Sequence, residues 1–106
     1  MLTIMVHAKI KEDKLTEYLE IAELLTKETR GNRPGCLSYS FNQNRASPTE
    51  FVLYEQWESQ TDLDNHIKEL CKLLGDPAPG YPLPERLLQM YESATPIYYN
   101  EVGANA

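Results

Sequence analysis

The chain has 106 residues, of which 42% are hydrophobic and 25% are charged, as in a soluble protein of one domain. The formal net charge of -6, with only 10 Lys and Arg, argues against the clustered basic surface that nucleic acid requires. No apolar stretch approaches the roughly 20 residues of a membrane span, and Cys36 and Cys71 form neither a zinc motif nor a redox dithiol. We therefore expect a cytoplasmic protein that binds neither nucleic acid nor membrane.

Every second residue of the first segment is apolar, namely Leu2, Ile4, Val6, Ala8 and Ile10, which predicts a half-buried strand. The segment has no basic start and no cleavage-site pattern, so we do not read it as a signal peptide. Asp13 is expected to cap a helix that begins at Lys14 and that is ended by Gly31. One face of this helix is apolar and should be buried, and its members are Leu15, Tyr18, Leu19, Ala22 and Leu25.

Two further strands follow the turn at 32–35. The segment 36–42 alternates, and the polar segment 42–49, which contains Pro48, reads as a hairpin loop. The third strand, 50–57, is rich in aromatic and β-branched residues. A second helix is then predicted to begin at the capping pair of Ser59 and Asp62 and to end at Gly75, with a buried stripe of Leu63, Ile67, Leu70, Cys71 and Leu74.

The remaining segments differ sharply in composition. The segment 76–84 contains four prolines and one glycine, which predicts an ordered loop or flap. Pro84 is suited to the first turn of a short third helix that carries Leu87, Leu88 and Tyr91. The last strand is predicted at 95–102. We assign 1–103 to a single domain and 104–106 to a flexible tail.

The predicted order β-α-β-β-α-(α)-β is typical of an α+β, ferredoxin-like split β-α-β fold, in which one antiparallel sheet carries helices on one face. The opposite face also carries apolar residues, because Met5, Val52 and Tyr54 lie on it and the adjacent Tyr98 and Tyr99 point to both faces. A sheet with two apolar faces needs a partner for the second one. We therefore expect a homodimer that forms through the sheet face.

Three stretches of the sequence resemble one known family. They are Pro34-Gly35-Cys36 with Tyr39, the run from Tyr54 to Gln60, and Leu63 with His66 three residues later. In this element order they resemble the antibiotic biosynthesis monooxygenase (ABM) family, which includes quinol monooxygenases and cofactor-independent oxygenases of aromatic polyketides. The resemblance implies a dimeric α+β barrel with a pocket between sheet and helices.

The resemblance nominates Glu55, Trp57 and His66 as the residues of that pocket. Many members of the family continue beyond this histidine with a second one, in a Thr/Ser-Pro-His-Phe stretch. Here the chain reads Ile67-Lys68-Glu69-Leu70-Cys71 instead. A mechanism that needs two histidines on this helix is therefore not supported.

Each nominated residue also has a structural interpretation. His66 lies on or beside the buried stripe of its helix, so it is either a core histidine or a general base. Trp57 is either a core residue or a flat wall against which an aromatic ligand stacks. Glu55 is the most informative of the three, because a carboxylate between Leu53 and Trp57 is costly to bury without a partner. Its partner could be Arg33, Arg86 or His66.

Three other residues are weaker candidates for substrate contacts. His7 lies on the opposite face of the first strand from its main apolar residues. Tyr39 and Tyr91 carry hydroxyl groups that could reach the pocket. Two histidines far apart predict no metal site, and the absence of GxGxxG, GxSxG and P-loop motifs predicts no nucleotide cofactor and no hydrolase triad.

The first hypothesis is a homodimeric, cofactor-independent monooxygenase that acts on a quinol, phenol or polycyclic aromatic substrate, with His66 as base, Trp57 as stacking wall and Glu55 as its polar partner. One alternative is an isomerase or degradative enzyme for a small polar signal molecule, since a histidine next to a glutamate would serve enolisation equally well. Another is a non-catalytic ligand-binding or stress-response barrel. Haem degradation is more distant, because it would require a matching Asn–Trp–His set that this spacing does not supply.

Overall fold

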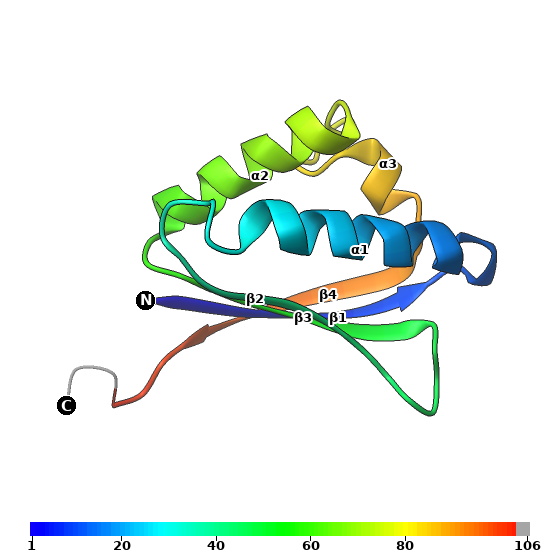
Figure 1. The fold of residues 1–106 in the computed structure, drawn as a ribbon, viewed down its shortest axis with the longest axis horizontal. Coiled ribbons are helices and arrows are strands. Elements are labelled where there is room, and N and C mark those ends of the chain that lie inside the picture. The colour runs from blue at the N-terminus through cyan, green and yellow to red at the C-terminus, as the bar shows by residue number, and fades with distance from the viewer. Residues whose placement is uncertain (104–106) are drawn as a thin grey trace.

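The computed structural model describes residues 1–103, so the predicted tail at 104–106 lies outside the described residues. Its elements are β1 (Leu2–Ile10), the 3₁₀ turn η1 (Glu12–Lys14), α1 (Leu15–Thr29), β2 (Cys36–Gln43), β3 (Glu50–Trp57), α2 (Gln60–Leu74), α3 (Glu85–Leu88) and β4 (Tyr91–Asn100). The strands form one antiparallel sheet in the order β2-β3-β1-β4. All helices lie on one face of this sheet (Figure 1), which confirms the predicted ferredoxin-like α+β fold.

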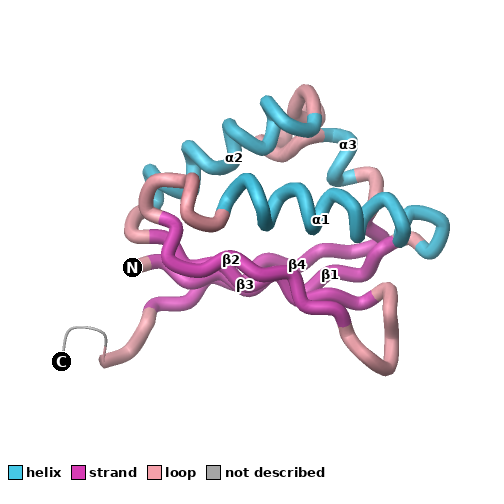
Figure 2. Tube along the Cα trace, in the orientation of Figure 1, coloured by secondary structure: helices cyan, strands magenta, loops and turns pink. Residues whose placement is uncertain are grey.

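The core lies between the sheet and the helices, and the opposite face of the sheet is bare (Figure 2). Strand alternation sends every second side chain of β3 into this core, so that Phe51, Glu55 and Trp57 are all buried. The register places Glu55 between Ile4 of β1 and Tyr39 of β2. An acidic side chain therefore stands at the centre of the sheet, on its helix-covered side.

The second helix begins and ends where its sequence predicts. Ser59 caps it by accepting a hydrogen bond from the backbone N–H of Asp62 at 3.2 Å, and Gly75 ends it with a φ of 111°. The helix buries one stripe against the sheet, and its fully buried members are Leu63, His66, Leu70 and Leu74. Within residues 1–103, no helix has the length and apolar character needed to cross a lipid bilayer.

The first helix differs from the prediction at its start and in its buried face. The 3₁₀ turn is closed by a hydrogen bond from the Lys14 N–H to the Lys11 carbonyl at 2.9 Å, and it moves the helix start to Leu15. No side chain among residues 1–103 caps the helix at this point, so the predicted Asp13 cap is wrong. Leu19, predicted to be buried, is 38% exposed. It stands at the margin of a stripe that follows i, i+3, i+4 and i+7 spacing and that consists of Tyr18, Ile21, Ala22 and Leu25.

The last strand begins at Tyr91 and not at residue 95, and the third helix ends at Leu88, so Tyr91 is a strand residue and not a helical one. Tyr91 pairs with Ile10 at an irregularity in the register, and the Lys11 N–H donates to the Met90 carbonyl at 2.8 Å. The prediction missed this start because Glu, Ser and Ala at 92–94 are poor strand formers. Pairing with β1 overrides this low strand propensity. The strand ends at residue 100, two residues before the predicted end.

The proline-rich segment 76–84 is an ordered loop, as predicted. The Ala78 N–H donates to the Leu83 carbonyl at 2.9 Å, and Pro77 and Pro84 form an isolated bridge. The loop is therefore closed on itself, and it leads directly into α3 beside the end of α2 (Figure 1).

Candidate functional site

Four of the six predicted site residues form one buried cluster between the sheet and α2. Glu55 and Trp57 come from β3, Tyr39 from β2 and His66 from the sheet-facing side of α2. Their exposed fractions are 0% for Trp57, 2% for Tyr39, 3% for His66 and 6% for Glu55. A ligand can therefore reach these side chains only when a neighbouring segment moves.

The indole of Trp57 is the hydrogen-bond partner of Glu55. Its Nε1–H donates to Glu55 Oε1 at 3.0 Å, because two residues separated by two positions on a strand lie on the same face. Of the three partners considered from the sequence, Arg33 and His66 form no hydrogen bond to this carboxyl group within residues 1–103, and Arg86 contacts Glu17 at 3.3 Å instead. The pairing thus engages only one of the two carboxyl oxygens.

The ring of His66 lies against two aromatic side chains. Its centroid is 4.7 Å from that of Trp57 with an interplanar angle of 36°, and 5.2 Å from that of Tyr39, which it meets edge-on. The imidazole therefore lies beside the indole, where an aromatic ligand would lie if Trp57 were a stacking wall.

Burial reverses the usual order of proton affinity in this cluster. Desolvation raises the pKa of Glu55 to about 7, although the hydrogen bond from Trp57 acts in the opposite direction. Desolvation lowers the pKa of His66 to about 4; the positive charge of Arg33 adds to this effect and the negative charge of Glu69 opposes it. At neutral pH the imidazole is uncharged and Glu55 is divided between acid and carboxylate. Glu55 is thus the better proton acceptor of the two.

Within residues 1–103, three buried side-chain polar atoms have no hydrogen-bond partner: Thr29 Oγ1, Arg33 Nε and His66 Nδ1. Thr29 was not a candidate from the sequence, and Arg33 was considered only as a possible partner of Glu55. An arginine in an Asn-Arg-Pro-Gly turn is ordinarily a solvated turn residue, and only its position directly before the Pro-Gly of the family motif could have drawn attention to it.

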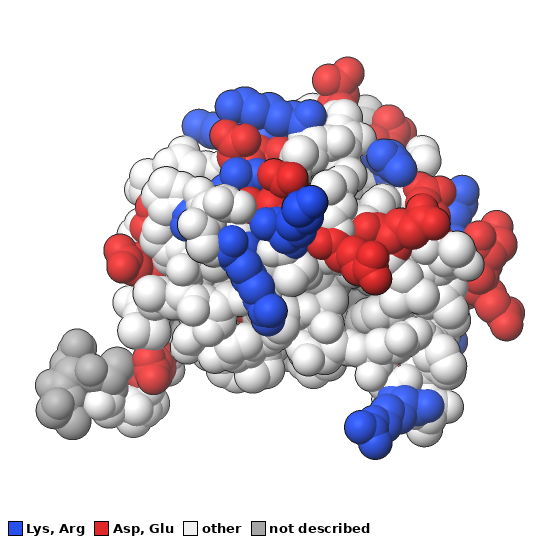
Figure 3. Space-filling view, in the orientation of Figure 1, with Lys and Arg blue, Asp and Glu red and all other residues white. Residues whose placement is uncertain are grey.

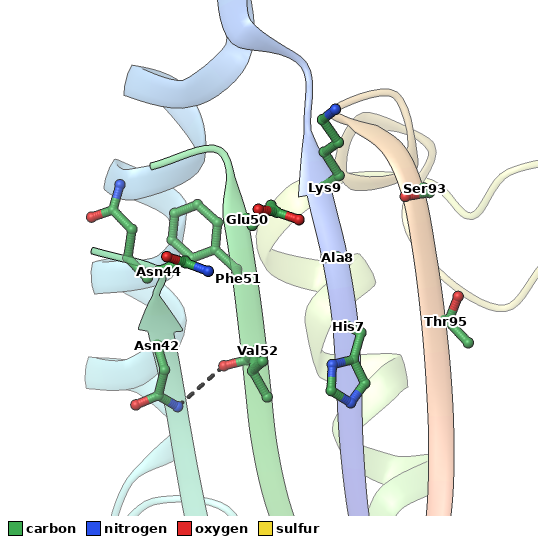
Figure 4. Close-up of a pocket in the computed structure, with 11 residues that line it drawn as sticks. His7, Ala8, Lys9, Asn42, Asn44, Glu50, Phe51, Val52, Ser93 and Thr95 are labelled. Atoms are coloured by element: carbon green, nitrogen blue, oxygen red, sulfur yellow. Dashed lines mark hydrogen bonds between the residues drawn. The ribbon is translucent and has the colours of Figure 1, made fainter. Parts of the chain in front are cut away.

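His7 lies outside this cluster, on the bare face of the sheet, as its parity predicted. There it contributes to a cavity of about 490 Å³ whose other side chains are mostly polar (Figure 4). Among them, Asn42 donates to the Val52 carbonyl at 3.1 Å, and Lys9, Ser93 and Thr95 line the side formed by β1 and β4 (Figure 4).

Tyr91 is engaged within the core. Its hydroxyl group is hydrogen-bonded to that of Tyr18 at 2.9 Å, and the two rings pack edge-on with centroids 5.5 Å apart. Burial raises the pKa of Tyr91 to about 12. Both phenols are therefore protonated at neutral pH and occupied by each other. Among residues 1–103, no group of three or more His, Cys, Asp or Glu side chains could hold a metal ion.

Comparisons with known proteins identify relatives of this chain. The model of a family described as antibiotic biosynthesis monooxygenase matches residues 1–69, which contain the whole cluster. An uncharacterised protein of Synechocystis, sll1783, is 32% identical over 60 residues, which are 57% of this chain and 40% of that protein. The chain thus spans less than half the length of this curated relative.

Solved structures resemble the chain over nearly its whole length. A Nitrosomonas europaea protein, provisionally described by the same family name, has a TM-score of 0.77 at 20% identity and covers 97% of this chain and 91% of its own. Rv0793 of Mycobacterium tuberculosis has a TM-score of 0.75 at 16% identity, and the match covers 99% of this chain and 98% of Rv0793. At such identities these structures support the fold.

Proposed function

Because the chain belongs to the antibiotic biosynthesis monooxygenase family, we propose that it is an oxygenase that acts on a quinol, phenol or polycyclic aromatic substrate and needs no bound cofactor. The observation that carries this proposal is Glu55, a buried carboxyl group with a pKa of about 7, next to the uncharged imidazole of His66. A group whose pKa lies near the working pH is suited to accept a proton and to return it later in the same cycle.

In the proposed reaction, Glu55 accepts a proton from a C–H or O–H group of the substrate, which becomes a carbanion or phenolate. This anion transfers one electron to O₂, and the resulting radical and superoxide combine to form a C–O bond in a peroxide. The O–O bond then breaks, and one oxygen atom stays on the substrate as a carbonyl. The other leaves as water, which takes the proton from Glu55 and a second hydrogen from the substrate carbon. Oxygen is the oxidant, and the substrate supplies all the electrons.

The order of pKa values supports a proposal in which the two side chains have different roles from those expected from the sequence. His66 was expected to be the base, but an imidazole with a pKa of about 4 holds a proton poorly at neutral pH. We assign proton transfer to Glu55 and hydrogen bonding to the substrate oxygen to His66. Trp57 then fixes the carboxyl group through its indole N–H.

Oxygen uptake with a panel of quinols and polycyclic phenols tests this function. We expect one substrate of the panel to be consumed with one equivalent of O₂ and to gain one labelled atom when the gas is ¹⁸O₂. Turnover without oxygen uptake would instead support an isomerase, and saturable binding without turnover would support a ligand-binding barrel. Either result would rule out the oxygenase.

We also propose that the functional form is a homodimer in which the bare sheet faces of two copies pack together. Met5 lies between Tyr54 and Ile97 in the register, and these three side chains form an apolar row across the bare face. Ile97 is 37% exposed and Tyr99, on the same face, is 43% exposed. In Figure 3 the charged side chains gather mainly over the helices, and the sheet below them is largely uncharged. Such a face favours burial against a second copy.

Ile97→Asp is expected to convert this dimer into a monomer, because it places a carboxylate in the apolar row, directly beside Met5. Leu24→Asp is the matched control, since Leu24 is 38% exposed but lies on α1. Light scattering at micromolar concentration should give a dimer for the wild type and for Leu24→Asp, and a monomer for Ile97→Asp. A monomeric wild type would contradict the proposed dimeric barrel.

A further inference from the structure

The turn between α1 and β2 is fixed against the first turn of α2. Gly35 lies so close to the side chain of Asp62 that a Cβ atom at residue 35 would collide with it, and the Gly35 carbonyl accepts a hydrogen bond from the Glu58 N–H at 2.8 Å. The Arg33 N–H donates to the Thr29 carbonyl at 3.1 Å. The backbone that carries Arg33 is therefore held at both ends, beside the helix that carries His66 one turn after Asp62.

Arg33 brings a positive charge to this place, and the anion on which it acts, Glu69, has its pKa lowered first by the hydrogen bond from Lys72 and only additionally by Arg33. Arg33 forms no salt bridge within residues 1–103, and its Nε–H is buried and unpaired. Glu69, one turn further along α2, is paired with Lys72 at 3.0 Å. A buried guanidinium N–H without an acceptor is costly, and native proteins ordinarily satisfy such groups with protein, water or ligand.

His66 has an unpaired atom of the same kind. Its Nδ1 is buried and has no partner in the part of the chain that the structure describes, and the residue as a whole is only 3% exposed. An uncharged imidazole can carry its proton on Nδ1 and donate from it. The charge of Arg33 acts on His66, so the guanidinium and the imidazole offer two unused N–H donors to the same region. The imidazole lies against the indole of Trp57, which in turn holds the carboxyl group of Glu55.

We propose that Arg33 and His66 together bind the anionic oxygen that the substrate acquires on deprotonation, and that the substrate is therefore one whose charge comes to rest on a ring oxygen, as a phenolate or enolate. This inference rests on the proposed function. When Glu55 accepts the proton, the negative charge passes to the substrate, and Arg33 supplies the compensating charge there. Donors fixed in advance around a developing oxyanion stabilise it without reorganisation.

Binding of 4-nitrophenol tests the site without turnover, because its phenolate absorbs visible light and its phenol does not. The wild type should bind the phenolate preferentially, so that the probe ionises at a lower pH when bound than when free. Arg33→Gln should weaken phenolate binding about 10- to 100-fold, which is the range for a hydrogen bond to a charged group. Arg33→Lys, which keeps the charge but loses the planar donor geometry, should lie between the two.

Arg45→Gln is the matched control, because Arg45 is exposed in the loop between β2 and β3 and the substitution changes the net charge equally. It should bind the phenolate as the wild type does. Equal binding by Arg33→Gln, or binding of the probe in its neutral form, would overturn the inference. If oxygen uptake fails while the phenolate still binds through Arg33, the site stands and only the oxygenase is refuted.

Discussion

Replacing Glu55 by glutamine should lower the rate of oxygen consumption about 10²- to 10⁴-fold, which is the usual contribution of a positioned proton-transfer group. Glutamine has nearly the same shape, and its carbonyl oxygen can still accept the hydrogen bond of the Trp57 indole, which is 3.0 Å from Glu55 Oε1. It cannot accept a proton from the substrate. The loss should therefore appear in kcat, with little change in substrate affinity.

Glu58→Gln is the control for this prediction, because Glu58 is exposed directly after the same strand and its removal changes the net charge equally. Its rate should equal that of the wild type. The wild-type kcat should also rise with pH through a pKa near 7, and Glu55→Gln should lose this dependence. A rate for Glu55→Gln within a few-fold of the wild type would remove this carboxyl group from the mechanism.

The dependence of folding stability on pH should change in opposite directions when Glu55 and His66 are replaced. The pKa of Glu55 rises from 4.5 to about 7 on folding, so its contribution to stability is present below pH 4.5 and is lost as the pH rises through 7. The pKa of His66 falls from 6.5 to about 4, so its contribution is present above pH 6.5 and is lost as the pH falls through 4. Between pH 4.5 and 6.5 the two effects oppose each other in the wild type.

Each shift corresponds to about 3 kcal/mol, at 1.36 kcal/mol for each pKa unit. Relative to the wild type, the free energy of unfolding of Glu55→Gln should rise by about 3 kcal/mol between pH 4.5 and 7, because the cost of ionising Glu55 is removed. That of His66→Gln should fall by about 3 kcal/mol, relative to the wild type, between pH 4 and 6.5. Urea unfolding at a series of pH values measures both differences. Parallel curves for all three proteins would show that neither group is perturbed.

The fold could be predicted from the sequence because local patterns and tertiary structure agree over most of the chain. Alternation in β1, the hairpin loop at 42–49 and the capping pair at Ser59 each reflect a short-range preference that packing leaves unchanged. The start of β4 was missed because the residues at 92–94 have no strand preference, and only their pairing with β1 makes them extended.

The residues of the site could be predicted where strand alternation and helical spacing determine which side chains face the core. Parity places Glu55 and Trp57 on one side of β3, and the stripe of α2 carries His66 to the same layer. The partner of Glu55 could not be chosen, because Arg33, Arg86 and His66 were all compatible with the sequence, whereas the structure pairs Glu55 with the indole of Trp57. A ligand-binding role of Arg33 was not predicted, because the burial of its Nε atom depends on a turn that packs on α2, which is a contact between distant segments.

The most direct test of this account is the titration of the Glu55 carboxyl carbon, followed by NMR of protein labelled with ¹³C in its glutamates and assigned with Glu55→Gln. We expect a pKa of about 7 for Glu55, while the His66 imidazole stays neutral until the pH falls to about 4. A Glu55 pKa at the ordinary value of 4.5 would mean that the carboxyl group is fully ionised and solvated at neutral pH. That result would contradict a proton-transfer site at Glu55.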